Sequence, residues 1–448
     1  MSDRIRRRPR RAARADAPSS DAHASEETSP DEDPAAPALP LLTLRDGLPG
    51  VIDTPAALAD AVARVAAGTG PVALDAERAS GYRYSARAYL IQLRREGAGT
   101  FLIDPIPFAD LDPLDAAIGD AEWILHAATQ DLACLREVGL RPRRLFDTEH
   151  AARLLGYPRV GLATLTETIL GHTMRKEHSA ADWSKRPLPA SWLEYAALDV
   201  EMLIELRTAL AAELESAGKD AWAAQEFAWL TGFTPAIRQD PWRRMSGVHK
   251  LRGRRRIAAA RELWYARDEL ARSRDTTAGR LLPDAAVIAA AKAMPADRAE
   301  LLRTEGFHGR AARGEADRWV AAVRRAAELP EADLPPTSVR SDGPPQARSW
   351  ADRDPVAAAR LATARAAMAT LSEEVSVPVE NLLTPDYLRR VLWEPPSGPD
   401  LAGAVADELA RLGARSWQIE LTAPLIVAAI TDPTMPATEP ETTSPTDS

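Results

Sequence analysis

The chain has 448 residues, 45% of them hydrophobic and 27% charged, with a formal net charge of −9. That length predicts about three domains, and the apolar fraction is enough to bury a sizeable core. No stretch approaches the ~20 uninterrupted apolar residues of a membrane span, and the single cysteine, Cys134, excludes a disulfide framework and a cysteine-based zinc site. We therefore expect a cytoplasmic protein, and the net charge taken whole argues against a nucleic-acid partner.

Residues 1–40 are the first distinct segment. An Arg-rich start passes into a Pro-rich and acidic run that has almost no large apolar residue. Such a composition cannot bury enough surface to offset the entropy lost on ordering, so the segment is predicted to be a disordered tail.

Residues 50–230 carry a strand pattern followed by a helix pattern. Four apolar runs of strand length come first, namely PVALDAE, AYLIQLRR, TFLID and AEWILHAA. The period then becomes helical in DLACLREVGL, TEHAARLLG and WLEYAALDVEMLIELRTALAAELE. Strands followed by mixed strand and helix predict an α/β domain.

From about residue 240 onward the chain shows no convincing strand, and helices separated by Pro and Gly are predicted. Residues 240–330 hold 20 Lys and Arg against 12 Asp and Glu, whereas residues 351–430 hold 7 against 11. The expected order is a disordered tail at 1–40, an α/β domain at 50–230, a basic helical domain at 248–328, a linker at 330–350, a second helical domain at 351–430 and a disordered tail at 432–448.

Asp75 and Glu77 stand two residues apart at the end of the first apolar run. On a strand, side chains at i and i+2 point to one face, so two carboxylates lie side by side. Burying such a pair unpaired costs several kcal/mol, and a divalent cation such as Mg²⁺ or Mn²⁺ relieves the repulsion. A pair of this kind is nevertheless more often a solvated turn.

Asp131, Tyr195 and Asp199 are further candidates. Asp131 opens a helix after AEWILHAA, where the ordinary role of an aspartate is to cap the helix or complement its dipole. Tyr195 and Asp199 are four residues apart on a predicted helix and therefore share a face. The ordinary interpretation is an amphipathic helix with a half-buried Tyr and an exposed Asp. Taken separately, each residue favours its ordinary structural role.

Together these stretches resemble the DEDD 3′–5′ exonucleases. ALDAERASGYRYSARAYLIQL resembles the first motif of that family, ILHAATQDLACL the second and YAALDV the third, with the tyrosine placed as in the Tyr subfamily. ADWSKRPLPASWLEYAALD is similar to ribonuclease D. The resemblance implies an RNase H-like exonuclease fold in which Asp75, Glu77, Asp131 and Asp199 hold two divalent cations, Mg²⁺ or Mn²⁺. It also implies that Tyr195 orients the attacking water.

Other residues near these motifs are weaker candidates. Gln92, on the second predicted strand, is a possible contact for the terminal nucleotide. Lys176, Trp183 and Arg186 precede the third motif. Lys176 and Arg186 could hold phosphates. The indole of Trp183 could stack on a base, or it could anchor its own loop. Asp147 is predicted to cap a helix at a strand-to-helix boundary rather than to bind a metal.

The basic helical domain at 248–328 resembles the HRDC domain. Ile257, Leu263, Trp264 and Leu270 form an apolar helix face, and arginines are expected on the other face. Contact with the RNA backbone is the expected role. EEVSVPVENLLTPDYLRRVLW, within 351–430, resembles the second, HRDC-like domain of ribonuclease D, whose acidic charge suits packing better than RNA binding.

The function implied by the resemblance is a 3′–5′ exoribonuclease acting on RNA 3′ ends, with tRNA precursors or other structured RNA as substrates. A monomer is favoured over an oligomer. A DNA 3′–5′ exonuclease is an alternative, because the same metal site hydrolyses either backbone. A non-catalytic RNA-binding scaffold is another, although the presence of all four carboxylates and the tyrosine argues against it.

Overall fold

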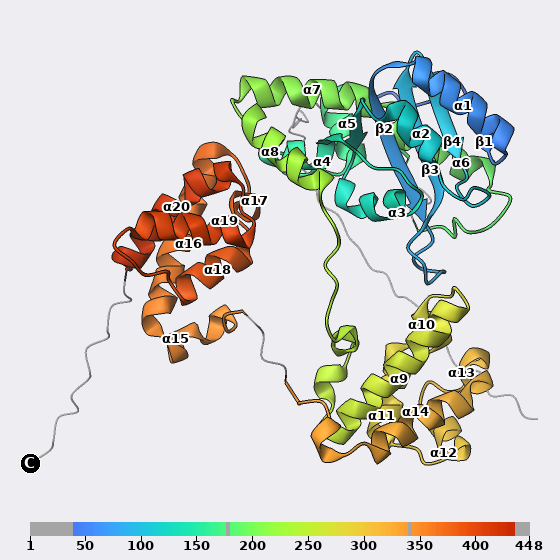
Figure 1. Cartoon of the computed structure of the whole chain (residues 1–448), viewed down its shortest axis with the longest axis vertical. Coiled ribbons are helices and arrows are strands. Elements are labelled where there is room, and N and C mark those ends of the chain that lie inside the picture. The colour runs from blue at the N-terminus through green and yellow to red at the C-terminus, as the bar shows by residue number, and fades with distance from the viewer. Residues whose placement is uncertain (1–38, 176–179, 339–342, 435–448) are drawn as a thin grey trace, which may run out of the picture. The chain divides into compact units, whose positions relative to one another are not determined.

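The computed structural model describes residues 39–175, 180–338 and 343–434 (Figure 1). The two predicted tails, 1–40 and 432–448, therefore lie almost entirely outside the described residues. At the edge of the first tail, the carbonyl of Pro40 accepts a hydrogen bond from the backbone N–H of Thr173 at 2.9 Å. The described part of the chain thus begins beside the α/β domain.

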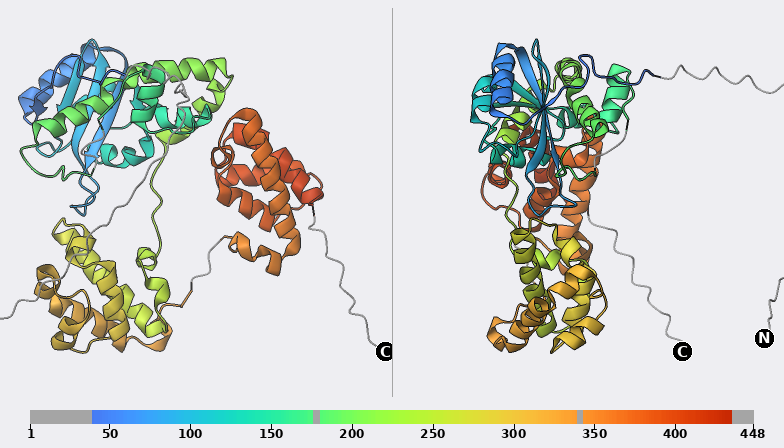
Figure 2. Two further views of the ribbon diagram at one scale, coloured as in Figure 1. Left: turned by 180° about the vertical axis from the view of Figure 1, so that it is seen from behind. Right: turned by 90° about the vertical axis from the view of Figure 1, so that its right-hand side faces the viewer.

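A mixed sheet forms the centre of the α/β domain, and its strand order in the described residues is β1-β4-β3-β2-β5-β6. β2, β3 and β4 are antiparallel, whereas β1 runs parallel to β4, β5 to β2 and β6 to β5. Helices lie against both faces of this sheet, which the right-hand view of Figure 2 shows nearly edge-on. The strands are β1 (Val51–Ile52), β2 (Thr69–Arg78), β3 (Ala88–Glu96), β4 (Gly99–Ile103), β5 (Glu122–Leu125) and β6 (Arg144–Asp147).

The four central strands, β2 to β5, lie in the four apolar runs, so these strand predictions are confirmed. Val72, Ala73 and Leu74 are consecutive and fully buried, because helices cover both faces of the sheet and leave no solvated side to alternate with. β1 was not anticipated, since two residues are too few to show a period.

Eight helices of the described residues belong to this domain. α1 begins where Thr54 accepts a hydrogen bond from the backbone N–H of Ala57 and Pro55 occupies the first turn. α6 packs across β2, β3 and β4 and so covers one face of the central strands. The helices are α1 (Pro55–Ala67), α2 (Asp112–Ile118), α3 (Leu132–Glu137), α4 (Thr148–Leu154), α5 (Leu162–Leu170), α6 (Ala190–Glu201), α7 (Leu203–Ser216) and α8 (Asp220–Thr231).

The basic domain is helical throughout its described residues. Ile257, Leu263 and Leu270 are buried, as the apolar pattern predicts. Arg267 departs from the expected solvated arginine face, because it is buried and its guanidinium binds Asp284 at 2.7 Å. The helices are α9 (Arg254–Ser273), α10 (Ala278–Leu281), α11 (Asp284–Ala293), α12 (Arg298–Arg303), α13 (Arg310–Gly314) and α14 (Ala316–Glu328).

The last domain is also helical, and the fold class predicted from sequence is confirmed. Part of the predicted linker is packed onto it: Arg389 donates hydrogen bonds to the carbonyls of Pro344 and Pro345 at 3.1 and 3.0 Å. The helices are α15 (Trp350–Arg353), α16 (Pro355–Val375), α17 (Val379–Leu382), α18 (Pro385–Trp393), α19 (Leu401–Leu412) and α20 (Ser416–Thr431). No described helix combines the length and the apolar character needed to cross a bilayer.

Candidate active site

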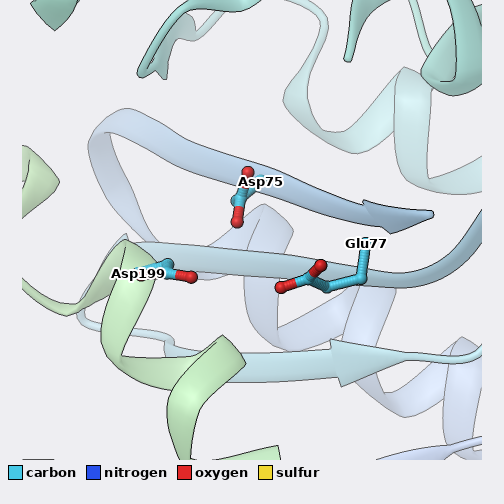
Figure 3. A group of neighbouring side chains, drawn as sticks. All are labelled: Asp75, Glu77 and Asp199. Carbon is cyan, nitrogen blue, oxygen red and sulfur yellow. The ribbon is translucent and has the colours of Figure 1, made fainter. Parts of the chain in front are cut away.

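Three carboxylates from two elements meet on one face of the sheet (Figure 3). Asp75 and Glu77 lie on β2, and Asp199 lies on α6, which crosses that face. One oxygen of each carboxylate lies within 4.8 Å of the other two. The i, i+2 spacing on the strand and one turn of a single helix therefore assemble this group.

Tyr195 lies one helical turn before Asp199 on α6. Its phenol donates a hydrogen bond to the Asp199 carboxylate, and this bond lowers the pKa of Asp199 and raises that of Tyr195, because it favours the ionised carboxylate and the protonated phenol. The neighbouring Ala196 and Ala197 are fully buried against Leu90 and other residues of the sheet. Small residues on one side of the helix thus let α6 approach the strands closely enough to bring its polar side to the carboxylates.

Asp131 is nearly buried at the start of α3 and lines the same cavity as the three carboxylates. It stands at the N-cap position but makes no side-chain capping bond, so the ordinary capping role is not the one it fills. Its nearest cation is Arg78, whose Nη2 lies 3.6 Å from Asp131 Oδ1. Asp131 is not one of the three residues whose oxygens lie within 4.8 Å of one another.

Asp147 caps α4, as predicted, by accepting a hydrogen bond from the backbone N–H of His150 at 3.0 Å. The same buried carboxylate also accepts from the backbone N–H groups of Ala127 and Ala128, at 3.1 and 2.8 Å. Ala127 has a left-handed backbone with φ of 58°, which is unfavourable for a residue with a Cβ. Asp147 therefore stabilises the strained turn that leads from β5 to Asp131.

The electrostatics of this group follow from burial and mutual repulsion. Burial, together with the charges of Asp75, Asp199 and Asp131, raises the pKa of Glu77 to about 9. Burial also raises the pKa values of Asp75, Asp131 and Asp199. The pKa of Tyr195 lies above its ordinary value, first because of burial and then because of Asp199. Buried carboxylates repel one another when all of them are ionised. They are suitable ligands for a divalent cation, because its positive charge stabilises their ionised forms.

The weaker candidates of the sequence are placed differently. Gln92 lies directly opposite Asp75 on β3 but is fully buried, so its side chain is not exposed to a nucleotide. Trp183 is also fully buried, which excludes base stacking and leaves the alternative in which it anchors its own loop. Lys176 lies outside the described residues.

Arg186 was a possible phosphate contact, but its guanidinium is already engaged within the protein. Nε binds Asp104 at 2.5 Å, Nη2 donates to the carbonyl of Tyr89 at 2.6 Å, and Nη1 donates to the carbonyls of Trp183 and Lys185 at 2.8 and 2.7 Å. The type of residue suggested a phosphate contact, whereas its bonds show that it pins the loop before α6 to the sheet.

Several residues of the cavity were missed by the sequence reasoning. The cavity has a volume of about 270 Å³ and is lined by the acidic residues and Tyr195, and also by Arg78, His126, Gln130 and Leu162. Of these, Arg78 had a usable signal, because it follows Glu77 directly at the end of β2.

Three stretches of the chain match models of known families. Residues 49–215 match a 3′–5′ exonuclease, residues 257–323 an HRDC domain and residues 343–430 a 3′ to 5′ exonuclease C-terminal domain. The first stretch contains the acidic group, Tyr195 and the whole sheet. Fold and site together define a metal-dependent 3′–5′ exonuclease.

Curated relatives give the family. Ribonuclease D of Pseudomonas paraeruginosa is 31% identical over 271 residues, which are 59% of this chain and 71% of that protein. Ribonuclease D of Escherichia coli is 32% identical over 270 residues, again 59% and 71% of the two chains. The chain belongs to the ribonuclease D family and is a 3′–5′ exoribonuclease.

Solved structures agree with this assignment. A protein from Bifidobacterium adolescentis is 39% identical with a TM-score of 0.80, over 88% of this chain and 100% of that one. Escherichia coli RNase D is 27% identical with a TM-score of 0.63, over 85% of this chain and 98% of that one. The likeness to both extends well beyond the α/β domain.

Proposed function

We propose that this exoribonuclease trims the 3′ ends of structured RNA, tRNA precursors among them, at a site formed by Asp75, Glu77, Asp131, Asp199 and Tyr195. The convergence of the Asp75, Glu77 and Asp199 oxygens within 4.8 Å is the observation that carries the proposal. The solved Escherichia coli relative, described as an exoribonuclease involved in structured RNA processing, supports the substrate class.

The four carboxylates are the proposed ligands of two divalent cations, Mg²⁺ or Mn²⁺. Their oxygens are hard donors, and their raised pKa values mean that the protein alone does not stabilise four negative charges in one cavity. When bound, such a pair of cations polarises the scissile phosphate and lowers the pKa of water. Arg78, beside Asp131, places a further positive charge at the edge of this group.

Tyr195 is proposed to position the attacking water. Because its pKa is raised, the phenol keeps its proton at neutral pH and is a poor general base. The proton is directed to Asp199, so the lone pairs of the phenol oxygen are left to accept a hydrogen bond from water. Tyr195 therefore orients the nucleophile and fixes the Asp199 carboxylate at the same time.

The HRDC domain is proposed to hold the RNA backbone. Arg252, Arg256, Arg303, Arg310 and Arg324 are exposed, in a domain that carries an excess of positive charge. Exposed guanidinium groups contact phosphates without reading bases, which suits a nuclease that must grip RNA of any sequence. A monomer suffices for the proposed site, because one chain supplies all of its residues.

The decisive experiment compares a tRNA precursor with a 3′ extension, a single-stranded RNA and a DNA of the same sequence, each with Mg²⁺, Mn²⁺ or EDTA. We expect mononucleotides to be released from the RNA 3′ ends with either cation and not with EDTA. Release from DNA at an equal or higher rate would favour the DNA exonuclease. Binding of RNA without release under all conditions would favour the non-catalytic scaffold.

A further inference from the structure

His126 lies directly after β5 and faces the cavity that holds Asp75, Asp131 and Tyr195. β5 runs parallel to β2, with Ala73 paired to Ile124, so the carboxyl ends of the two strands bring His126 to the level of the acidic group. His126 is neither one of the proposed metal ligands nor the residue proposed to position the water. Its ring is therefore a polar group of the cavity whose role is still to be explained.

The hydrogen bonds of Thr148 determine which ring nitrogen of His126 carries the proton. The Thr148 hydroxyl donates its single proton to the carbonyl of Leu125 at 3.3 Å. The same oxygen lies 2.9 Å from His126 Nδ1, and with its proton already used it must accept. Nδ1 is then the protonated nitrogen, and Nε2 presents a lone pair.

The neutral form of the ring agrees with this arrangement. The pKa of His126 is lowered, first by burial and also by the charge of Arg153. The charges of Asp147 and Glu149 oppose this shift without cancelling it. Among the described residues, the one side-chain hydrogen bond of His126 is that to Thr148, which leaves Nε2 free to accept a proton from a bound molecule.

A lone pair in this position selects the groups that can approach it. Phosphate oxygens and ionised carboxylates have no proton to donate and are disfavoured beside Nε2. The donors closest to a scissile phosphate in RNA are the ribose hydroxyls, while the bases lie a sugar ring away. An unprotonated imidazole nitrogen is a strong acceptor for such a hydroxyl.

We propose that Nε2 of His126 accepts a hydrogen bond from a ribose 2′-hydroxyl of the last two nucleotides, so that His126 contributes to the preference of this site for RNA over DNA. The inference rests on the proposed location of the active site. It adds a sugar contact to a site whose other members act on the phosphate and the water.

The test measures single-turnover cleavage of one oligonucleotide sequence in several forms. These are all-ribose, 2′-deoxy at the terminal nucleotide, 2′-deoxy at the penultimate nucleotide, 3′-deoxy at the terminus, and all-DNA. The wild type is expected to lose about 3- to 10-fold on the form that lacks the contacted hydroxyl, the range for one net hydrogen bond. The cleavage rate of His126→Ala on the all-ribose form should be lower than that of the wild type by a similar factor. On the form that lacks the contacted hydroxyl, the two proteins should cleave at about the same rate.

Thr148→Val tests the tautomer, because the ring then loses the group that fixes its proton on Nδ1. It should weaken the discrimination between sugars, whereas Thr208→Val should not. Thr208 makes the same kind of bond, to the Ile204 carbonyl at 2.9 Å, on the exposed side of α7. The ¹⁵N chemical shifts of His126, identified by their loss in His126→Ala, should report an unprotonated Nε2.

Two outcomes would overturn the proposal. One is a protonated Nε2, and the other is that His126→Ala discriminates between the sugar forms as strongly as the wild type, for example because its rate falls equally on every form. Mn²⁺ affinity of His126→Ala, measured by electron paramagnetic resonance, should equal that of the wild type. If the wild type cleaves none of the forms, the proposed function fails. The sugar contact is then decided by the affinity of both proteins for the same oligonucleotides with Ca²⁺.

Discussion

Tyr195 hydrogen-bonds to Asp199 from one turn earlier on α6, so one helix provides both a carboxylate of the acidic group and the residue that orients it. Any change in the tilt of α6 moves both groups together. The small, buried Ala196 and Ala197, which set how closely α6 approaches the sheet, thereby also set the position of the phenol.

Tyr195→Phe should lower the rate of the chemical step by ~10²-fold, about 2.7 kcal/mol, because one oriented hydrogen bond to water and one to Asp199 are lost. Single-turnover kinetics with excess enzyme measure that step directly. Tyr157→Phe is the matched control, since its phenol also binds a carboxylate, Glu213 at 2.8 Å, outside the cavity. Equal losses in the two variants would contradict a positioning role.

Asp199→Asn should abolish nucleotide release and leave the fold intact. The amide is nearly isosteric, but it lacks the charge expected of a metal ligand. Removing one of several crowded carboxylates should leave the free energy of unfolding of the metal-free protein unchanged or raise it. Denaturant unfolding and a release assay check the two halves separately. A variant that retains activity would remove Asp199 from the proposed site.

Divalent cations should bind more tightly as the pH rises, with release of protons. The pKa of Glu77 is raised from 4.5 to about 9, so between these values the folded metal-free state holds more protons than the unfolded state. Its stability should therefore fall as the pH rises across that window, and Mg²⁺ should reverse the fall. Calorimetric titration at pH 7 in two buffers of different ionisation enthalpy counts the protons; zero release would contradict a neutral Glu77.

RNA affinity should fall steeply with salt if the HRDC domain contacts phosphates. Arg252→Ala combined with Arg256→Ala should weaken binding about equally for different sequences and make the salt dependence shallower. Arg411→Ala, an exposed arginine of the last domain paired to Glu408, is the control. Fluorescence anisotropy between low and high salt decides the matter, and an affinity insensitive to salt would exclude the backbone contact.

The sequence predicted the four central strands and the acidic candidates, because both depend on local patterns: an apolar run of strand length, two acids at i and i+2, a tyrosine four residues before an aspartate. Gln92, Trp183 and Arg186 were interpreted from residue type alone. Their burial and bonds depend on partners such as Asp104 and Tyr89, far away in the chain, and no local pattern reports such partners.

His126 was missed for the same reason. Its Nδ1 lies 2.9 Å from the hydroxyl of Thr148, which belongs to the next strand-to-helix unit of the sheet. The pairing of β5 with β6 places the two residues side by side, and that pairing is a property of the assembled sheet.

The carboxylate of Asp147 ties down the turn at Ala127 and Ala128 with protein groups alone. The backbone leading to Asp131 is thus shaped before a cation binds, and binding does not have to order it. Free energy from cation binding then remains available to hold the substrate phosphate instead of organising the loop.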